Sequence, residues 1–341
     1  ESEVKTMSET PEQMLDNTTD RPLVTFALTA YNQEKYIREA VEGAFSQIYE
    51  PLEIILSDDC SSDRTYEIMK SMADAYEGPH EVFVRQSPTN RGIGCHINGV
   101  FALAKGDYFA LAAGDDISEP DRIEDLIAVL SNLTSRGANP IQYSALTMLQ
   151  TIDENGTVGP KTKIPSHGKR LPSKTLPICE FGLDELLAGR LFTSGPSRVF
   201  SRTLYETFGN LRDDCFTEDI IYLFRSVLAG NVLYFDKATV RYRLHSASLS
   251  QPKTLYAKPF EGVEAQLRAD LETASMAGMI TPETADRAEK WINDNVAFRN
   301  FYRARIAGHR PDLGDLLTIL KARHLSTRRK FGILREFAGI R

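Results

Sequence analysis

Short apolar runs alternate with segments of helical periodicity through the first 130 residues of the chain. Runs with the length and composition of buried strands occupy residues 23–28, 52–56, 81–85 and 108–113. The segments between them repeat apolar residues every three or four positions, which predicts helices with one apolar face toward a sheet. Strand and helix alternate in units of about 25–30 residues, which is typical of right-handed crossovers in a mainly parallel sheet.

Polar residues follow three of these predicted strands at the point where each strand ends. Thr29 follows the first strand, Asp58 and Asp59 follow the second, and Asp115 and Asp116 follow the fourth. Ligands of parallel sheets bind outside the carboxyl ends of the strands, so we expect these side chains to converge on one crevice. Adjacent carboxylates repel each other, and a divalent cation between them and a diphosphate would relieve that repulsion.

The same polar residues also have a simpler explanation. Asn32 is placed to cap the helix that follows the first strand. Asp is favoured at helix N-caps, so Asp58 and Asp59 could serve only to start the next helix. Asp115 and Asp116 could form a simple turn before a helix. Both explanations remain open at this stage.

The pattern changes beyond residue 130. Further strands are expected over residues 141–152, 198–200, 232–235 and 239–244, with helices over residues 183–189, after residue 219 and throughout the chain from about residue 252. Residues 157–177 are rich in Pro, Lys and Ser without periodicity, which predicts a mobile loop and a candidate lid or acceptor gate.

The chain is thus expected to have three parts. Residues 1–21 are polar and aperiodic, which predicts a disordered or loosely attached arm. Residues 22–250 form the predicted α/β domain with a mainly parallel sheet flanked by helices. Residues 251–341 form a predicted helical extension.

Composition limits the function further. The chain has 341 residues, of which 42% are hydrophobic, and its net charge of −7 argues against a nucleic-acid footprint over the whole protein. Four scattered cysteines without a CxxC pair predict reduced thiols in a cytoplasmic protein and argue against zinc. No apolar run reaches the ~18 residues of a membrane-spanning helix. The chain begins with Glu rather than Met, which is consistent with a segment missing upstream.

The charge is unevenly distributed. From Arg299 to the end there are eleven Lys and Arg against three Asp and Glu, interleaved with Leu, Ile and Phe. Three explanations are open for this segment: a solvated face of packed helices, peripheral attachment to an anionic membrane surface, or contact with a subunit or partner.

A nucleotide crevice in such a sheet usually has a glycine-rich phosphate loop, and the sequence contains neither GxGxxG nor GxxxxGK[ST]. Carboxylates line the predicted crevice instead. Because carboxylates cannot hold a diphosphate directly, a metal must mediate, and oxygen ligands favour Mn²⁺ or Mg²⁺ over Zn²⁺.

Six short motifs stand in an order and spacing that resemble the family 2 inverting glycosyltransferases. They are LTAYN at residues 28–32, SDDCSSD at 57–63, NRG at 90–92, GDD at 114–116, TED at 217–219 and RLH at 243–245. This resemblance covers roughly residues 22–250. It implies a GT-A fold and the use of a nucleotide-activated sugar.

The resemblance also implies roles for the donor-binding residues. Thr29, Asp58 and Asp59 match positions that hold the nucleobase and ribose, and Asp115 matches a position that binds ribose and metal. Asp116 matches a metal ligand. The acid often found two residues before Asp115 is Ala113 here, which leaves the division of metal ligation between Asp115 and Asp116 open.

The remaining roles concern the reaction itself. Asp219 matches the catalytic base, and His245 matches a residue that closes over the metal or the diphosphate. Arg91 is a candidate for nucleotide binding, for which helix capping or packing is the simpler alternative. The candidates for contact with the donor or acceptor sugar are Glu218, Ser194 and Asn98. At the start of a helix, Glu218 and Asp219 could also simply complement the helix dipole.

The resemblance therefore predicts a metal-dependent, inverting hexosyltransferase. The first candidate donor is a UDP-sugar, and the expected acceptor is a hydroxyl of a glycan or lipid-linked molecule in the synthesis of a cell-envelope polysaccharide. A sugar-nucleotide pyrophosphorylase is the enzymatic alternative, although residues 28–32 lack its glycine-rich, basic signature. A catalytically silent sugar-nucleotide-binding module is the alternative of another class.

Overall fold

The computed structural model describes residues 21–135, 137–163, 168–171, 177–191, 195–322 and 325–338. The strands are β1 (Val24–Ala30), β2 (Leu52–Asp58), β3 (Glu81–Gln86), β4 (Tyr108–Ala113), β5 (Ile117–Ser118), β6 (Tyr143–Asp153), β7 (Val158–Lys161), β8 (Lys169–Leu171), β9 (Ile178–Phe181), β10 (Arg198–Ser201) and β11 (Asn231–Leu244). The helices are α1 (Ile37–Phe45), α2 (Thr65–Asp74), α3 (Gly92–Phe101), α4 (Arg122–Ser135), α5 (Leu183–Leu187), α6 (Arg202–Phe208), α7 (Asp219–Ala229), α8 (Pro252–Ala257), α9 (Glu261–Met276), α10 (Pro282–Ile306), α11 (Leu313–Lys321) and α12 (Thr327–Phe337). Two 3₁₀ turns are η3 (Pro140–Gln142) and η4 (Gly195–Ser197).

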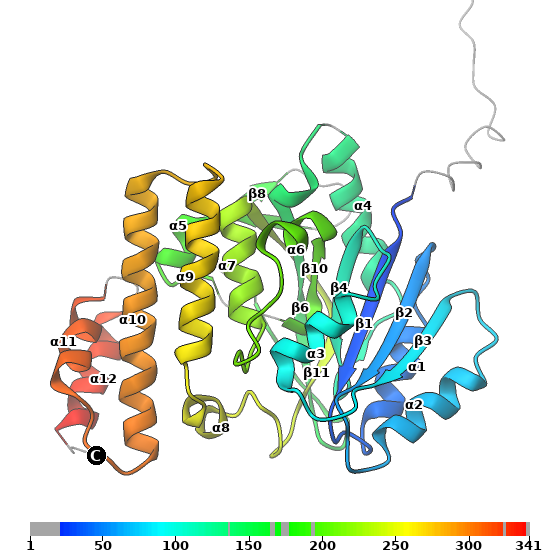
Figure 1. Cartoon of the computed structure of the whole chain (residues 1–341), viewed down its shortest axis with the longest axis horizontal. Helices are drawn as coiled ribbons and strands as arrows, with labels where there is room; N and C mark the ends of the chain where they lie inside the picture. The colour runs from blue at the N-terminus through cyan, green and yellow to red at the C-terminus, as the bar shows by residue number, and fades with distance from the viewer. Residues whose placement is uncertain are drawn as a thin grey trace, which may run out of the picture.

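The strands of the described residues form one sheet in the order β3-β2-β1-β4-β10-β6-β11-β9-β8, with β5 beside β11 and β7 beside β6 (Figure 1). The four N-terminal strands β3, β2, β1 and β4 are mutually parallel. The strand β10 then runs antiparallel to both β4 and β6. The prediction of a mainly parallel α/β sheet from the first 130 residues is therefore confirmed.

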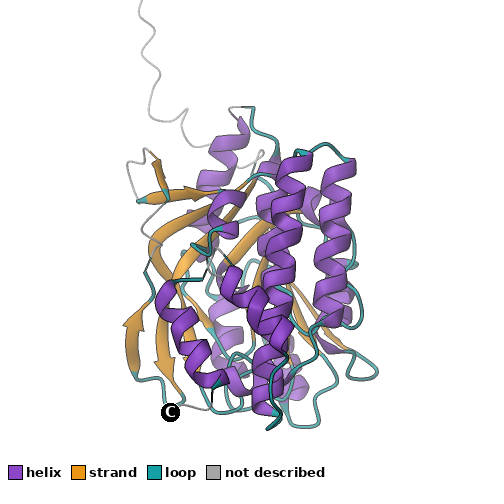
Figure 2. Cartoon of the chain, turned by 90° about the vertical axis from the view of Figure 1, so that its left-hand side faces the viewer, coloured by secondary structure: helices purple, strands orange, loops and turns teal. Residues whose placement is uncertain are grey.

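Helices cover the sheet on both faces, as Figure 2 shows from the side of α10. Every residue of β2 is buried, and in β1 alternate side chains face opposite layers. Phe26 and Leu28 pack in a core cluster with α1 and α4, whereas Ala27 belongs to a second cluster that includes α3, α7 and α9. Burial on both faces explains why these strands have near-continuous apolar sequences.

Only the last of the C-terminal helices have a hydrophobic core of their own. The helix α9 and the first half of α10 pack in the same cluster as α7, through residues such as Leu267 and Trp291. Only the end of α10, with α11 and α12, has its own small cluster around Phe301. The predicted helical region is thus confirmed, and the boundary expected at residue 250 does not separate two hydrophobic cores.

The prediction of a loop over residues 157–177 was wrong for the part that is described. The strand β7 pairs with β6, and β8 pairs with β9. All four residues of β7 are exposed, so the strand has no apolar alternation by which its sequence could be recognised. Residues 164–167 and 172–176 of the predicted lid lie outside the described residues, as does nearly all of the predicted N-terminal arm.

Two smaller predictions were also wrong. Asn32 does not cap α1, whose N-cap is Tyr36. Asn32 has a left-handed φ of 51°, which an N-cap does not adopt, and its side chain instead accepts hydrogen bonds from Ser62. The two strands expected over residues 232–235 and 239–244 are one strand, β11, interrupted by bulges on either side of Ala238.

Two general expectations can be compared with the structure. All four cysteines are free thiols. No helix within the described ranges has the length and apolar character needed to cross a bilayer.

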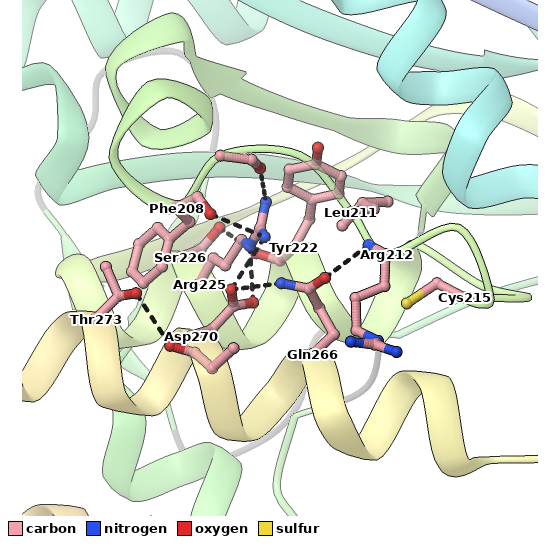
Figure 3. A network of polar contacts seen from close by, with 12 residues as sticks. Phe208, Leu211, Arg212, Cys215, Tyr222, Arg225, Ser226, Gln266, Asp270 and Thr273 are labelled. Atoms are coloured by element: carbon pink, nitrogen blue, oxygen red, sulfur yellow. Dashed lines mark hydrogen bonds and ion pairs between the residues drawn. The ribbon is translucent and has the colours of Figure 1, made fainter.

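A buried ion pair ties α7 to α9 (Figure 3). Arg225 donates two hydrogen bonds to the carboxylate of Asp270, at 2.7 and 3.0 Å. The two side chains are 0% and 1% exposed. Gln266 donates a further bond to Asp270, and Arg225 also donates to the carbonyl of Gly209. This network fixes the helix that carries Asp219 at its first position.

Asp270→Ala is expected to lower the free energy of unfolding by about 3–5 kcal/mol, because it leaves the Arg225 guanidinium buried without a counter-charge. Urea denaturation followed by circular dichroism measures the change. Asp74→Ala, which removes an exposed pair with Lys70 on α2, is the matched control and should change stability little. Equal losses in the two variants would contradict the role given to the buried pair.

Candidate active site

The strand register brings the first two polar segments together at the carboxyl edge of the sheet. Thr29 lies beside Ser57 on one side and Ala113 on the other. The Gly114 N–H donates to the Thr29 carbonyl at 3.0 Å, and the Asp59 N–H donates to the Ala30 carbonyl at 2.9 Å. The ends of β1, β2 and β4 are therefore joined directly, as the convergence hypothesis requires.

Asp58 stabilises the turn after β2 through hydrogen bonds of its side chain. Its carboxylate is buried and accepts hydrogen bonds from the Ser61 N–H at 2.8 Å, from Gln86 Nε2 at 2.9 Å and from the Ser61 hydroxyl. Cys60, which lies in the turn between Asp58 and Ser61, adopts a left-handed φ of 61°. The contacts of Asp58 lie within the protein and hold this strained turn in place.

Asp59 connects the same turn to the start of α3. Its carboxylate accepts from the backbone N–H groups of Arg91, at 3.1 Å, and Gly92, at 2.9 Å. Gly92 has a positive φ of 76°, which glycine adopts readily. The Arg91 side chain is exposed at this edge. Asp59 thus holds the NRG segment at this edge of the sheet, and Asn90 Oδ1 accepts a further bond from the Gly92 N–H.

Asn98 is engaged elsewhere. Its Nδ2 donates to the Leu211 carbonyl at 2.7 Å, and its Oδ1 accepts from the Leu211 N–H at 2.9 Å. This pair of bonds joins α3 to the loop that precedes α7, so the amide group positions that loop. Ser194, the other candidate for sugar contact outside the TED motif, lies outside the described residues.

The turn after β4 presents two unlike carboxylates. Asp116 is 5% exposed, and its Oδ1 accepts from the Arg243 N–H at 2.8 Å, whereas its Oδ2 is buried without a hydrogen-bond partner among the described residues. Burial, and then the charge of Asp115, raise the pKa of Asp116 well above its usual range. Asp115 is less buried and contacts His245 Nε2 through its Oδ2 at 3.0 Å.

Arg243 connects the turn after β4 to neighbouring segments of the chain. Its guanidinium donates to the Asp115 carbonyl at 3.0 Å, the Asp153 carbonyl at 3.3 Å and the Glu39 carboxylate at 3.0 Å. It also stacks over the Tyr36 ring at 4.7 Å. The RLH motif therefore contributes a buried arginine as well as His245, whose ring lies 4.9 Å from that of Tyr36.

The donor set at this turn is suited to a shared metal ion and not to a closed protein cage. Within the described parts of the chain, no three His, Cys, Asp or Glu side chains are grouped to hold a metal on their own. Mg²⁺ and Mn²⁺ prefer oxygen ligands, and Mg²⁺ is commonly bound by one or two carboxylates together with substrate phosphates. Asp115, with the unpartnered Oδ2 of Asp116 and with His245 nearby, fits that arrangement.

Glu218 and Asp219 reach the same edge through η4. Because β10 is antiparallel to β4, the 3₁₀ turn η4 before it lies at the carboxyl end of β4. A Cβ at Gly195 in that turn would overlap the carboxylate of Asp219, so only glycine leaves room for it. Asp219 is the first residue of α7, with Glu218 as its N-cap. The structure thus brings the TED motif to the edge that carries Asp115 and Asp116.

The two acids form a coupled pair beside a buried arginine. Burial, and then the charge of Asp219, raise the pKa of Glu218 well above its usual range. Burial also raises the pKa of Asp219, while the positive charge of Arg198 and a hydrogen bond from Glu218 oppose that rise. The pKa of Glu218 is thus raised further than that of Asp219, which favours a proton on Glu218 before Asp219. Arg198 is fully buried on β10, and nothing in its sequence context marked it for this position.

The chain has relatives among known proteins. The family model "Glycosyl transferase family 2" matches residues 25–208. An uncharacterized glycosyltransferase of Rickettsia typhi is 33% identical over 320 residues, covering 92% of this chain and 93% of that protein. The putative glycosyltransferase EpsE of Bacillus subtilis is 37% identical over 161 residues, covering 46% of this chain and 54% of EpsE. A Rickettsia felis relative is longer, and the match spans 35% of it.

Solved structures share the fold. S. aureus TarS 1-349, in complex with UDP-GlcNAc, has a TM-score of 0.57 at 18% identity, covering 88% of this chain and 79% of that one. The mannosyltransferase PcManGT from Pyrobaculum calidifontis, in complex with GDP-Man and Mn²⁺, has a TM-score of 0.52 at 15% identity, covering 94% and 81%. At these identities the likeness concerns the fold. Together with the family match over more than half of the residues, it establishes that the chain belongs to glycosyl transferase family 2 and has the GT-A fold.

Proposed function

We propose that this protein transfers a sugar from a nucleotide-diphosphate donor to an acceptor hydroxyl, with inversion at the anomeric carbon and with Asp219 as general base. The observation that carries the proposal is the position of the Glu218–Asp219 pair, at the same sheet edge as the Asp115–Asp116 turn. One edge thus offers a charged base and a separate group of carboxylates suited to a metal-bound diphosphate.

Asp219 has the properties that a base in this reaction needs. Inversion is a single in-line displacement, in which the acceptor hydroxyl loses its proton as the new bond forms. Burial raises the pKa of the neighbouring Glu218 further than that of Asp219, which favours Asp219 as the member of the pair that accepts a proton. Its Oδ1 has no hydrogen-bond partner among the described residues. One base is sufficient, whereas a retaining glycoside hydrolase uses two carboxylates that flank the bond.

The carboxylate turn is assigned to the departing diphosphate. A Mn²⁺ or Mg²⁺ ion bound there supplies positive charge that stabilises the leaving group. Asp115 and His245 are the candidate donors, with side chains 16% and 8% exposed, beside the more deeply buried Asp116. Arg243 orients this turn through the Asp115 carbonyl and through its own N–H, which bonds to Asp116. Thr29, Asp59 and Arg91 line the adjoining edge, where the nucleoside is expected.

The donor and acceptor are assigned by class only. The structural neighbours bind UDP-GlcNAc in one case and GDP-Man with Mn²⁺ in the other, and a UDP-sugar is our first candidate for this chain. The proposed acceptor is a hydroxyl of a glycan or a lipid-linked molecule in a cell-envelope pathway. A pyrophosphorylase would instead form pyrophosphate from a sugar 1-phosphate and UTP, and a silent module would bind the donor without turnover.

Asp219→Asn is expected to lower kcat by about 10²–10⁴, because the amide cannot accept the acceptor's proton. Donor binding, measured by calorimetry with UDP, should persist, and donor hydrolysis with Mn²⁺ reports the lost turnover. Glu206→Gln on α6, an exposed acid, is the matched control. Unchanged turnover in Asp219→Asn would refute the assignment of the base.

Activity should fall on acidification at a higher pH than for an exposed aspartate, since burial raises the pKa of Asp219. Arg198 opposes that rise, so Arg198→Met should raise the pKa further and move the acidic limb of the kcat/KM profile to higher pH. Arg198→Lys keeps the positive charge and should move this acidic limb less. The exposed Arg190→Met is the control, and identical profiles for Arg198→Met and Arg190→Met would count against the electrostatic role of Arg198.

Asp115→Asn is expected to weaken Mn²⁺-dependent binding of UDP by at least about tenfold, because a neutral amide is a poorer ligand than a carboxylate for a hard cation. Calorimetric titrations with Mn²⁺ and with EDTA measure this loss. Glu154→Gln alters only an exposed acid that pairs with Lys35 and serves as control. If wild-type protein binds UDP equally well in EDTA, the metal is not part of the site.

A further inference from the structure

Exposed apolar side chains are concentrated near the end of the chain. Thirteen large hydrophobic side chains are exposed among the described residues, and five of them lie between residues 306 and 334. They are Ile306, Leu313, Leu317, Phe331 and Leu334, and Phe331 is 64% exposed. Single exposed apolar residues are ordinary on a protein surface, but a cluster of this kind calls for an explanation.

Four of these five residues form one face on each of two consecutive helices, α11 and α12. Leu313 and Leu317 are four residues apart on α11, and Phe331 and Leu334 are three residues apart on α12, so each pair shares a helix face. The small core beneath uses other positions, Ile319 and Ile333, which are fully buried. The outer pairs are therefore not needed to pack these helices. Figure 1 shows α11 and α12 at the end of the molecule opposite β3.

Basic side chains accompany these apolar residues. Arg328 is exposed three residues before Phe331, and Lys321 is exposed four residues after Leu317. The segment from Arg299 onward has eleven Lys and Arg against three Asp and Glu, although the whole chain has 40 against 47. The helix α11 begins with Asp312 and Asp315, so the positive charge beside these apolar residues comes from Lys321 and from the basic residues of α12. Apolar residues beside such a basic helix match the chemistry of an anionic lipid surface.

We propose that the outer face of α11 and α12, defined by Leu313, Leu317, Phe331 and Leu334 with Lys321 and Arg328, docks the protein on an anionic membrane surface. The apolar side chains enter the boundary between headgroups and acyl chains, and the basic side chains contact lipid phosphates. A twofold contact between two copies is disfavoured, because it would bring the same basic side chains together. The inference goes beyond the proposed transfer reaction and does not depend on it.

Co-sedimentation of the full chain with vesicles tests this directly. Wild-type protein should bind phosphatidylcholine vesicles that contain phosphatidylglycerol, bind pure phosphatidylcholine vesicles much less, and lose binding as salt is raised. The double variant Phe331→Ala, Leu334→Ala should bind the anionic vesicles at least about tenfold more weakly, since burial of apolar area contributes to interfacial binding. Arg328→Gln with Lys321→Gln should reduce both the affinity and its salt dependence.

Phe83→Ala is the matched control, because it removes a 49% exposed phenylalanine from β3 at the opposite end of the molecule. It should bind as wild type does. Circular dichroism of each variant verifies folding, and UDP binding by calorimetry keeps this test separate from that of the transfer reaction. The proposal is overturned by equal binding to neutral and anionic vesicles, by no binding to either, or by an unaltered affinity in the Phe331 and Leu334 variant. It is also overturned if sedimentation velocity shows that this face mediates self-association instead.

Discussion

Four buried arginines hold the acidic residues of this fold where they are. Arg122, Arg198, Arg225 and Arg243 are among its largest fully buried side chains. Each lies near at least one carboxylate: Asp116 for Arg122, Asp219 for Arg198, Asp270 for Arg225, and Glu39 and Asp116 for Arg243.

Burying an ionised group is costly unless it is paired and hydrogen-bonded, and this constraint shapes the carboxyl edge of the sheet. Carboxylates grouped at the strand ends repel one another unless positive charge lies close to them. Arg122 donates to the Ser118 hydroxyl and to the Leu111 carbonyl behind Asp116, and burial lowers its pKa to about 9. Arg243 approaches the same turn from β11. Both arginines bring positive charge close to Asp116, and Asp115 remains the less buried of the two acids.

Much of this arrangement could be predicted because its signals are local. The apolar runs that became β1, β2 and β4 are buried on both faces, so their sequences are continuous and easily recognised. Parallel pairing then requires that residues after those strands meet at one edge. Thr29, Asp59 and Asp115 could be placed at the carboxyl edge of the sheet from strand direction and sequence order alone.

What could not be predicted depends on contacts between distant segments. Arg198 has the sequence context of an ordinary strand residue, and only the pairing of β10 with β4 brings it beside the TED motif. Asp58 and Asp59 looked like helix caps or nucleotide ligands. The structure adds a contact that the sequence did not indicate: Asp59 accepts hydrogen bonds from backbone N–H groups more than 30 residues away. An exposed strand such as β7 leaves no apolar signal at all.

The contrast between the two acid pairs follows from what surrounds them. Both consist of adjacent carboxyls at the sheet edge, and in both burial raises the pKa of one member well above its usual range. At Asp115–Asp116 the less buried acid contacts His245, and Asp116 has Arg122 and Arg243 nearby, so a divalent cation would add to that positive charge at Asp115. At Glu218–Asp219 the charge of Arg198 opposes the rise that burial causes in the pKa of Asp219, which favours its ionised form. The two pairs therefore differ in what lies beside the acid that we propose to act: His245 beside Asp115, and the charge of Arg198 beside Asp219. That difference supports the separate roles, metal binding and general base, that we propose for them.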